Sequence, residues 1–210
     1  MKNTIRIILI TLLLLAACNK PNHTYNTTYD AEAAAFADSV YDAELLRERM
    51  EQYESEGKKG EALLIMQKLG TVMRNKSDFN AAVSLHDRCI ATASELRDTL
   101  QLIIAYNNQG TNYRRIGDLE QASSYHYKAL GLCDKITGDT SFIARKNIVR
   151  TLNGLGNVML SLGNDEVAEE MFRRALKGEE ELGSATGQAI NYANIGALVE
   201  QLIEGVLAVG

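Results

Sequence analysis

Apolar residues recur at helical spacing along most of the chain. From about residue 38 onward, large apolar side chains return every three or four positions, and short polar or glycine-containing breaks separate the stretches. This periodicity is typical of amphipathic helices. It predicts helices over residues 38–56, 61–76, 79–97, 99–116, 119–136, 142–162, 165–182 and 186–202, the first with a start anywhere between Asp30 and Asp38. The only proline, Pro21, lies before this array, which suits unbroken helices because proline interrupts them.

Every second predicted helix from residue 61 onward carries a glycine in the same local setting. A large residue stands four positions earlier, and in the first three copies small residues stand twelve and nineteen positions later. At spacings of 40, 46 and 40 residues, the motif pairs are Leu69-Gly70, Gln109-Gly110, Leu155-Gly156 and Ile195-Gly196. Glycine inside a helix costs about 1 kcal/mol relative to alanine, so its recurrence indicates places where two helices pack closely. The body of the chain is therefore an internal repeat.

Capping residues mark the helix ends within the repeats. Asp78, Asp118 and Asn164 each precede a helical stretch. Their side chains can accept hydrogen bonds from free backbone N–H groups of the first turn, worth about 1 kcal/mol each. Gly117 and Gly163 stand where the preceding helix must stop and reverse, a position that favours left-handed backbone. The sequence therefore predicts helix pairs joined by tight turns.

The second and third copies show the repeat most clearly. The second runs Tyr106-Asn107-Asn108-Gln109-Gly110, Tyr113, Gly117-Asp118-Leu119-Glu120-Gln121-Ala122 and Lys128-Ala129-Leu130, and the third runs Leu152-Asn153-Gly154-Leu155-Gly156-Asn157 to Ala175-Leu176. These residues resemble the tetratricopeptide repeat, with a period longer than its usual length of about 34 residues. The resemblance covers about residues 61–202. It implies an all-α fold, a right-handed α-solenoid of stacked antiparallel helix pairs with one concave face.

The end of the chain departs from the repeat. We expect an N-terminal helical cap over residues 30–60, repeats over about 61–98, 99–141 and 142–185, an incomplete repeat over 186–202, and an atypical tail over 203–210. The tail carries one charge, Glu204, among several aliphatic residues. Exposed apolar surface marks an interface or a defect. Two explanations stay open: truncation of a longer protein, or an end that a partner or a second copy of the chain covers by self-association.

The N-terminus has the pattern of an export signal. Lys2 and Arg6 precede and enter an apolar run that ends at Ala17. The run is too short for a transmembrane helix, which needs roughly 20 apolar residues. Leu15-Ala16-Ala17-Cys18 resembles the bacterial lipobox, which implies cleavage of residues 1–17 and lipidation of Cys18; an ordinary cleaved signal is the alternative. Polar residues 18–29 then form a tether. The sequence thus predicts a membrane-anchored lipoprotein of the bacterial cell envelope.

The resemblance implies a concave groove, lined by the first helix of each pair, that binds a protein or peptide. Asparagine offers both a donor and an acceptor to a peptide backbone, and an arginine guanidinium can bind a carboxylate through two hydrogen bonds. The alternative is that the asparagines serve packing and the arginines are merely solvated. The candidate groove residues are Asn107, Asn108, Thr111, Arg114, Arg115, Arg150, Asn153, Asn157 and Asn194.

Composition and motifs exclude several other functions. The net charge of −5 provides no electrostatic basis for nucleic-acid binding. Nucleophile, phosphate-loop and metalloprotease motifs do not occur in the sequence, so we expect no catalytic residue, cofactor or metal. His86 and His126 occupy a place that Phe172 takes in the third copy, which favours packing, and Cys89 fills a small-residue position.

Two hypotheses for function follow. The first is a non-enzymatic scaffold, anchored to the envelope, that binds a protein or peptide. The second is a truncated extracytoplasmic sensing region of a two-component kinase or transcriptional regulator, because such regions resemble this array.

Overall fold

The computed structural model describes residues 29–136, 138 and 141–209. The predicted signal peptide and Cys18 lie outside the described residues, as does the tether up to residue 28. Helices account for most of the described part, which contains no strand, so the predicted all-α fold class is confirmed.

The helices follow the order that the periodicity predicts. They are α2 (Ala31–Ser39), α3 (Ala43–Ser55), α4 (Lys59–Asn75), α5 (Phe79–Glu95), α6 (Thr99–Ile116), α7 (Leu119–Cys133), the short 3₁₀ helix η1 (Asp134–Ile136), α8 (Phe142–Ser161), α9 (Asp165–Glu181) and α10 (Ala185–Val209).

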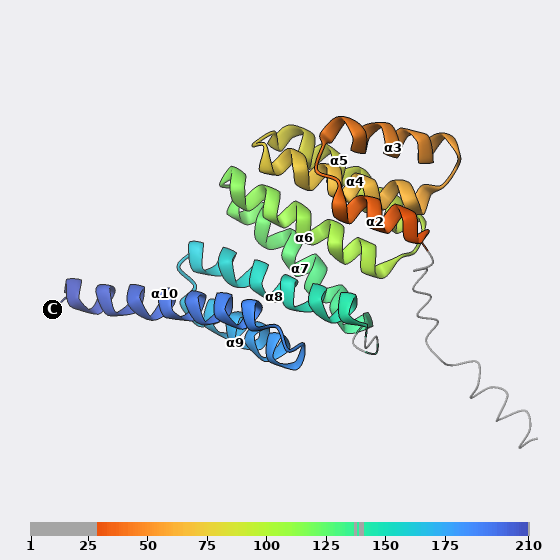
Figure 1. Ribbon diagram of the computed structural model, residues 1–210. Coiled ribbons are helices and arrows are strands. Elements are labelled where there is room, and N and C mark those ends of the chain that lie inside the picture. The colour runs from red at the N-terminus through yellow and green to blue at the C-terminus, as the bar shows by residue number, and fades with distance from the viewer. Residues whose placement is uncertain (1–28, 137, 139–140, 210) are drawn as a thin grey trace, which may run out of the picture.

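The helices stack as pairs in two layers (Figure 1). Each α-helix from α3 to α9 packs against the next α-helix along the chain. Within the first layer, α2 packs on α4, α4 on α6, and α6 on α8, whereas α5, α7 and α9 of the second layer make at most marginal contact with one another. The first layer is therefore the more closely spaced one, and the stack curves with α4, α6 and α8 on its concave side.

Two helices differ from their predicted bounds. The first predicted helix is two helices, because Val40 is extended and the Asp42 side chain caps a new helix by accepting from the N–H groups of Glu44 and Leu45. The last predicted helix runs on to Val209 instead of ending at residue 202. Residues 203–209 contain neither proline nor a capping side chain, so nothing local ends it.

The predicted caps are confirmed. The Asp78 and Asp118 carboxylates accept from the backbone N–H three residues later at 3.0 Å, and Asn164 does the same at 3.4 Å. Gly117 and Gly163 have φ values of 96° and 72°. Both glycines thus adopt the left-handed backbone that the turns between paired helices require.

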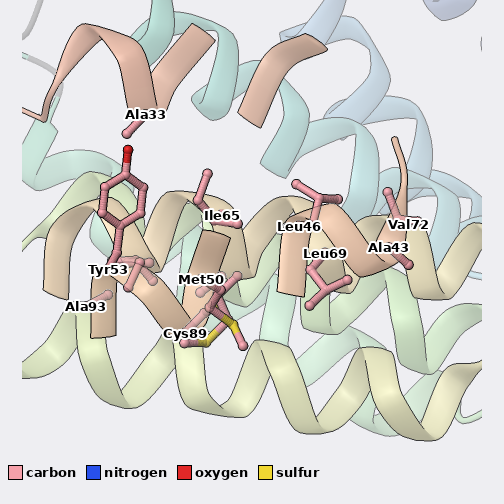
Figure 2. Close-up of a cluster of buried hydrophobic side chains, with 14 residues drawn as sticks. Ala33, Ala43, Leu46, Met50, Tyr53, Ile65, Leu69, Val72, Cys89 and Ala93 are labelled. Atoms are coloured by element: carbon pink, nitrogen blue, oxygen red, sulfur yellow. The ribbon is translucent and has the colours of Figure 1, made fainter. Parts of the chain in front are cut away.

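The core is built from one apolar cluster after another along the stack. Figure 2 shows the N-terminal cluster, where Met50 and Tyr53 of α3 and Ile65 of α4 lie near Cys89 and Ala93 of α5. Each large side chain so buried contributes about 1.5–3 kcal/mol. Separate clusters lie around α6 and α7 and around α8 and α9. Each cluster joins neighbouring helices, and the clusters follow one another along the stack. The stack therefore forms a continuous surface on which a site can extend across repeats.

The motif glycines make room for a ring from the following helix. A Cβ on Gly70 would lie 2.6 Å from the imidazole of His86, a Cβ on Gly110 would lie 2.7 Å from that of His126, and a Cβ on Gly156 would lie 2.6 Å from Phe172. The predicted close packing is therefore confirmed for the first three copies. Gly196 has nothing within 4 Å of its Cβ position, because no described helix follows α10 to supply a ring.

Candidate functional site: an arginine cluster on the concave layer

The exposed candidate groove residues lie on α6 and α8. Arg114 and Arg115 are exposed near the C-terminal end of α6, and Arg150 is exposed on α8. Thr111 is half-buried and donates to the carbonyl of Asn107 within its own helix. Asn194 is half-buried on α10. The site therefore centres on α6 and α8, with α4 beside them.

Arg74 of α4 belongs to this cluster, although the sequence analysis did not select it. The residue is 4% exposed, and its Nη1 donates to the carbonyl of Asn108 at 3.3 Å and to Oδ1 of Asn112 at 3.1 Å. Its Nε has no hydrogen-bond partner. A signal for it existed in the sequence, because Arg74 stands four residues after Gly70 just as Arg114 stands four residues after Gly110.

A polar network joins the three helices of the concave layer. Asn108 of α6 donates through Nδ2 to Oε1 of Gln67 on α4 at 2.9 Å, and its Oδ1 accepts from Nη2 of Arg150 on α8 at 2.8 Å. Gln67 in turn donates to the carbonyl of Gln101 at 3.1 Å. Asn108 is therefore a buried bridge between Gln67 and Arg150, and it fixes the position of the Arg150 guanidinium.

Asn107 is not a surface residue. It is fully buried, its Nδ2 donates to Oγ1 of Thr151 at 2.7 Å, and its Oδ1 lies 3.1 Å from Nδ1 of His126. This side chain connects α6 to α7 and α8 and has no polar atom left for a ligand. Asn107 therefore serves helix packing, which is the alternative role that the sequence allowed for the asparagines.

Two further asparagines lie on α8. Asn153 and Asn157 are half-buried, and Nδ2 of Asn157 donates to the carbonyl of Asn153 at 2.8 Å. Oδ1 of Asn153 is buried and has no hydrogen-bond partner. Asn153 thus keeps an unused acceptor, whereas Asn157 uses its donor within its own helix.

The cluster is positive and uncompensated. None of Arg74, Arg114, Arg115 and Arg150 forms an ion pair with a carboxylate of the described residues. Burial, followed by the charges of Arg150 and Arg115, lowers the pKa of Arg74 to about 10. Guanidinium groups gathered in this way bind carboxylates and other anions with charge-assisted hydrogen bonds.

The histidines and cysteines have packing roles. Burial lowers the pKa of His86 to about 3 and that of His126 to about 4, so both rings are neutral at pH 7. Cys89 and Cys133 are buried free thiols, and burial raises the pKa of both. Across residues 29–136, 138 and 141–209, no group of three or more His, Cys, Asp or Glu side chains could hold a metal ion.

The comparisons with known proteins identify the repeat. Tetratricopeptide-repeat profiles match residues 61–135 and residues 148–185, which together make up more than half of the chain. The chain therefore belongs to the tetratricopeptide-repeat family. Proteins built from this repeat typically act as scaffolds that bind other proteins. A comparison with curated proteins found no match.

Two solved structures share the fold. The crystal structure of BtubC (BKLC) from P. vanneervenii superposes with a TM-score of 0.63 and 23% sequence identity, over 81% of this chain and 65% of that one. The apo form of RapI superposes with a TM-score of 0.56 and 17% identity, over 88% of this chain and 71% of that one. The chain thus spans slightly less than two thirds of BtubC. Within the described residues, no helix combines the length and the apolar character needed to cross a bilayer.

Proposed function

We propose that this protein is a scaffold that binds an acidic segment of a partner protein on its concave layer. Arg114, Arg115 and Arg150 would contact the partner's carboxylates, and the buried charge of Arg74 would attract them. The buried Arg74, which has an unpartnered Nε and no carboxylate counter-charge, is the observation that carries the proposal.

The energetics of a buried cation support an anionic ligand. Removing one charge from water costs several kcal/mol unless an opposite charge lies nearby. The fold supplies hydrogen bonds to Arg74 but no carboxylate, so part of this cost persists while the groove is empty. An acidic segment would add the missing negative charge. It would also pair with the exposed guanidinium groups of Arg114 and Arg115, whose solvent screening is stronger, and with the Arg150 guanidinium that Asn108 holds in place.

The test is capture of a glutamate-rich peptide by the concave layer. The double variant Arg114→Glu with Arg150→Glu should abolish binding in a fluorescence anisotropy titration, while circular dichroism stays unchanged. The charge-matched control is Arg173→Glu with Arg174→Glu, because both arginines are exposed on α9 of the other layer. Equal loss in both double variants, or binding that survives Arg114→Glu with Arg150→Glu, would overturn the proposal.

We further propose that the protein is anchored to the bacterial envelope through a lipid on Cys18. The lipobox-like residues Leu15-Ala16-Ala17-Cys18 support this proposal. Several acyl chains hold a protein firmly, since each buried CH₂ contributes about 0.8 kcal/mol. Replacing Cys18 with serine should move the protein from the membrane fraction to the soluble fraction, and membrane retention of this variant would refute the anchor. Affinity capture from an envelope extract would then identify the partner.

The final helix suggests that copies of the chain associate. Val199, Leu202, Ile203 and Leu207 of α10 are all large apolar side chains with 45% or more of their surface exposed. Figure 1 shows that α10 extends well past the end of α9. We propose that this stripe packs against the same stripe of a second copy. Sedimentation should show a dimer that the Leu202→Glu variant dissociates; a wild-type protein that stays monomeric at all concentrations would contradict this.

A further inference from the structure

The concave layer opens between its last two helices. Along this layer α6 packs on α8, but α8 and α10 make at most marginal contact with each other, and both pack on α9 instead. A cavity of about 430 Å³ lies in this opening, lined by α8, by Glu179 of α9 and by the first turns of α10. Arg150 belongs to the arginine cluster and also lines the cavity. The cavity therefore continues the surface that carries the cluster.

An ion pair occupies the space between the helices next to the cavity. The Glu179 side chain is only 4% exposed, and both of its carboxylate oxygens accept from Nζ of Lys146, at 2.6 and 2.7 Å. Gly187 of α10 leaves room for this carboxylate, because a Cβ there would collide with it. Since the charges of Lys146 and Glu179 offset each other, the pair shapes the cavity and adds no net charge.

The surface that the cavity offers to a ligand is largely apolar. Ile190 of α10 lines it with a side chain that is 53% exposed. Lys146 has its head group on Glu179 and presents the aliphatic stem of a side chain that is 39% exposed. Arg150 supplies the net positive charge at the side of the cluster. The lining thus suits an apolar group that lies next to a carboxylate.

The size of the cavity favours a large ring. An engineered protein cavity of about 150 Å³ holds a benzene molecule, so one of about 430 Å³ has room for a bicyclic ring and part of its backbone. An aromatic ring is also attracted to a neighbouring guanidinium through its π face. Aromatic side chains are common anchors of protein interfaces, because one ring buries a large apolar area in one pocket.

We propose that the acidic segment carries an aromatic anchor, with tryptophan the best fit, directly beside the carboxylate that pairs with Arg150, and that this ring enters the cavity between α8, α9 and α10. This inference rests on the proposed binding of an acidic segment by the concave layer. It adds selectivity to that binding, since the cluster attracts any acidic segment by charge whereas the cavity selects a segment with a ring inside the acidic run.

The test compares three peptides that have the same glutamate run and differ at one central residue, which is tryptophan, leucine or alanine. The chain contains no tryptophan, so tryptophan emission comes from the peptide alone. On titration with the wild-type protein this emission should shift to shorter wavelength and become protected from acrylamide quenching, because the ring leaves water. Competition against a labelled peptide should show the tryptophan peptide binding about tenfold more tightly than the alanine peptide and about threefold more tightly than the leucine peptide.

Two variants assign the anchor to the cavity. Ile190→Ser removes the apolar side chain of the lining and should lower the tryptophan-to-alanine affinity ratio about threefold. Tyr192→Ser is the matched control, because Tyr192 lies two residues later on α10, outside the cavity lining, and this variant should keep the wild-type ratio. Both side chains are more than half exposed, so neither change should unfold the protein.

The possible failures separate this inference from the proposed function. Unshifted tryptophan emission at saturating protein, equal affinity for the tryptophan peptide and either of the other two, or a ratio that Ile190→Ser and Tyr192→Ser change equally would overturn the anchor. In these cases the alanine peptide still binds, and the proposed function stands. Absence of binding by all three peptides would instead contradict the proposed function, and the anchor with it.

Discussion

Replacing Arg74 with methionine should make the free protein more stable, although it deletes a buried, hydrogen-bonded side chain. Methionine keeps most of the length and volume of the arginine stem, so the change removes the charge and the donors with little loss of packing. Buried large-to-small or polar-to-apolar substitutions usually destabilise a protein. A gain in stability on Arg74→Met would therefore be specific to an uncompensated buried charge.

The magnitude follows from the burial of Arg74 and its hydrogen bonds. Its pKa falls from 12.5 to about 10, and at 1.36 kcal/mol per pKa unit the charged form is disfavoured by about 3 kcal/mol in the folded protein. The loss of the Nη1 donor leaves Oδ1 of Asn112 short of a partner, which costs about 1–3 kcal/mol. The net gain is therefore about 1 kcal/mol, or about 2–4 °C in Tm for a chain of this size.

The assay is urea denaturation of the wild type and the Arg74→Met variant at pH 7, with and without sodium sulfate. Sulfate should stabilise the wild type more than the variant, because only the wild type has the buried cation for the anion to offset. Arg173→Met is the control: this exposed arginine pairs with Glu169 one turn away, and its loss should change the free energy of unfolding by less than about 0.5 kcal/mol. An Arg74→Met variant more than 1 kcal/mol less stable than the wild type, or an equal response to sulfate, would refute the reasoning.

Two more predictions concern the ring positions and their glycines. Burial lowers the pKa of His86 from 6.5 to about 3 and that of His126 from 6.5 to about 4. Below pH 6.5 the unfolded chain therefore binds more protons than the folded protein. The free energy of unfolding is thus highest above pH 6.5 and falls as the pH drops toward 4. Each histidine should remove about 2–3 kcal/mol of unfolding free energy between pH 7 and pH 4.5. A double His→Phe variant whose urea midpoint still shifts by the full wild-type amount between these two pH values would contradict this. Gly70→Ala should destabilise the protein, because its Cβ would collide with His86, whereas Gly196→Ala, with open space around it, should stabilise α10 by up to about 1 kcal/mol. Thermal unfolding that gives both alanine variants the same sign would rule out the packing argument.

The repeat glycines made most of the fold predictable. Their recurrence predicted close helix packing, because a costly residue recurs only where packing requires it, and the structure adds that the rings of His86, His126 and Phe172 lie over Gly70, Gly110 and Gly156. The break between α2 and α3 escaped prediction, since neither glycine nor proline marks it and the Asp42 cap resembles any other acidic residue of a helix surface.

The candidate site was less accessible to sequence reasoning. Helical position alone places Asn107 and Asn108 on neighbouring faces of α6. The side chain of Asn107 hydrogen-bonds to Thr151 and His126 in the interior. The side chain of Asn108 instead bridges Gln67 and Arg150. These differences depend on contacts with other helices, which periodicity does not specify. Arg74 was missed because its copy of the repeat is the weakest in sequence, although its position matches that of Arg114.

The central claim is that an acidic segment binds to the arginine cluster, and its most direct test is the affinity of one glutamate-rich peptide for the wild type and for Arg74→Met. Fluorescence anisotropy at low and at physiological salt gives both dissociation constants. The account predicts at least fivefold weaker binding by the variant despite its greater stability, and a difference that persists at physiological salt because the charge of Arg74 is buried and poorly screened. Equal affinity of the two proteins for the peptide would contradict it.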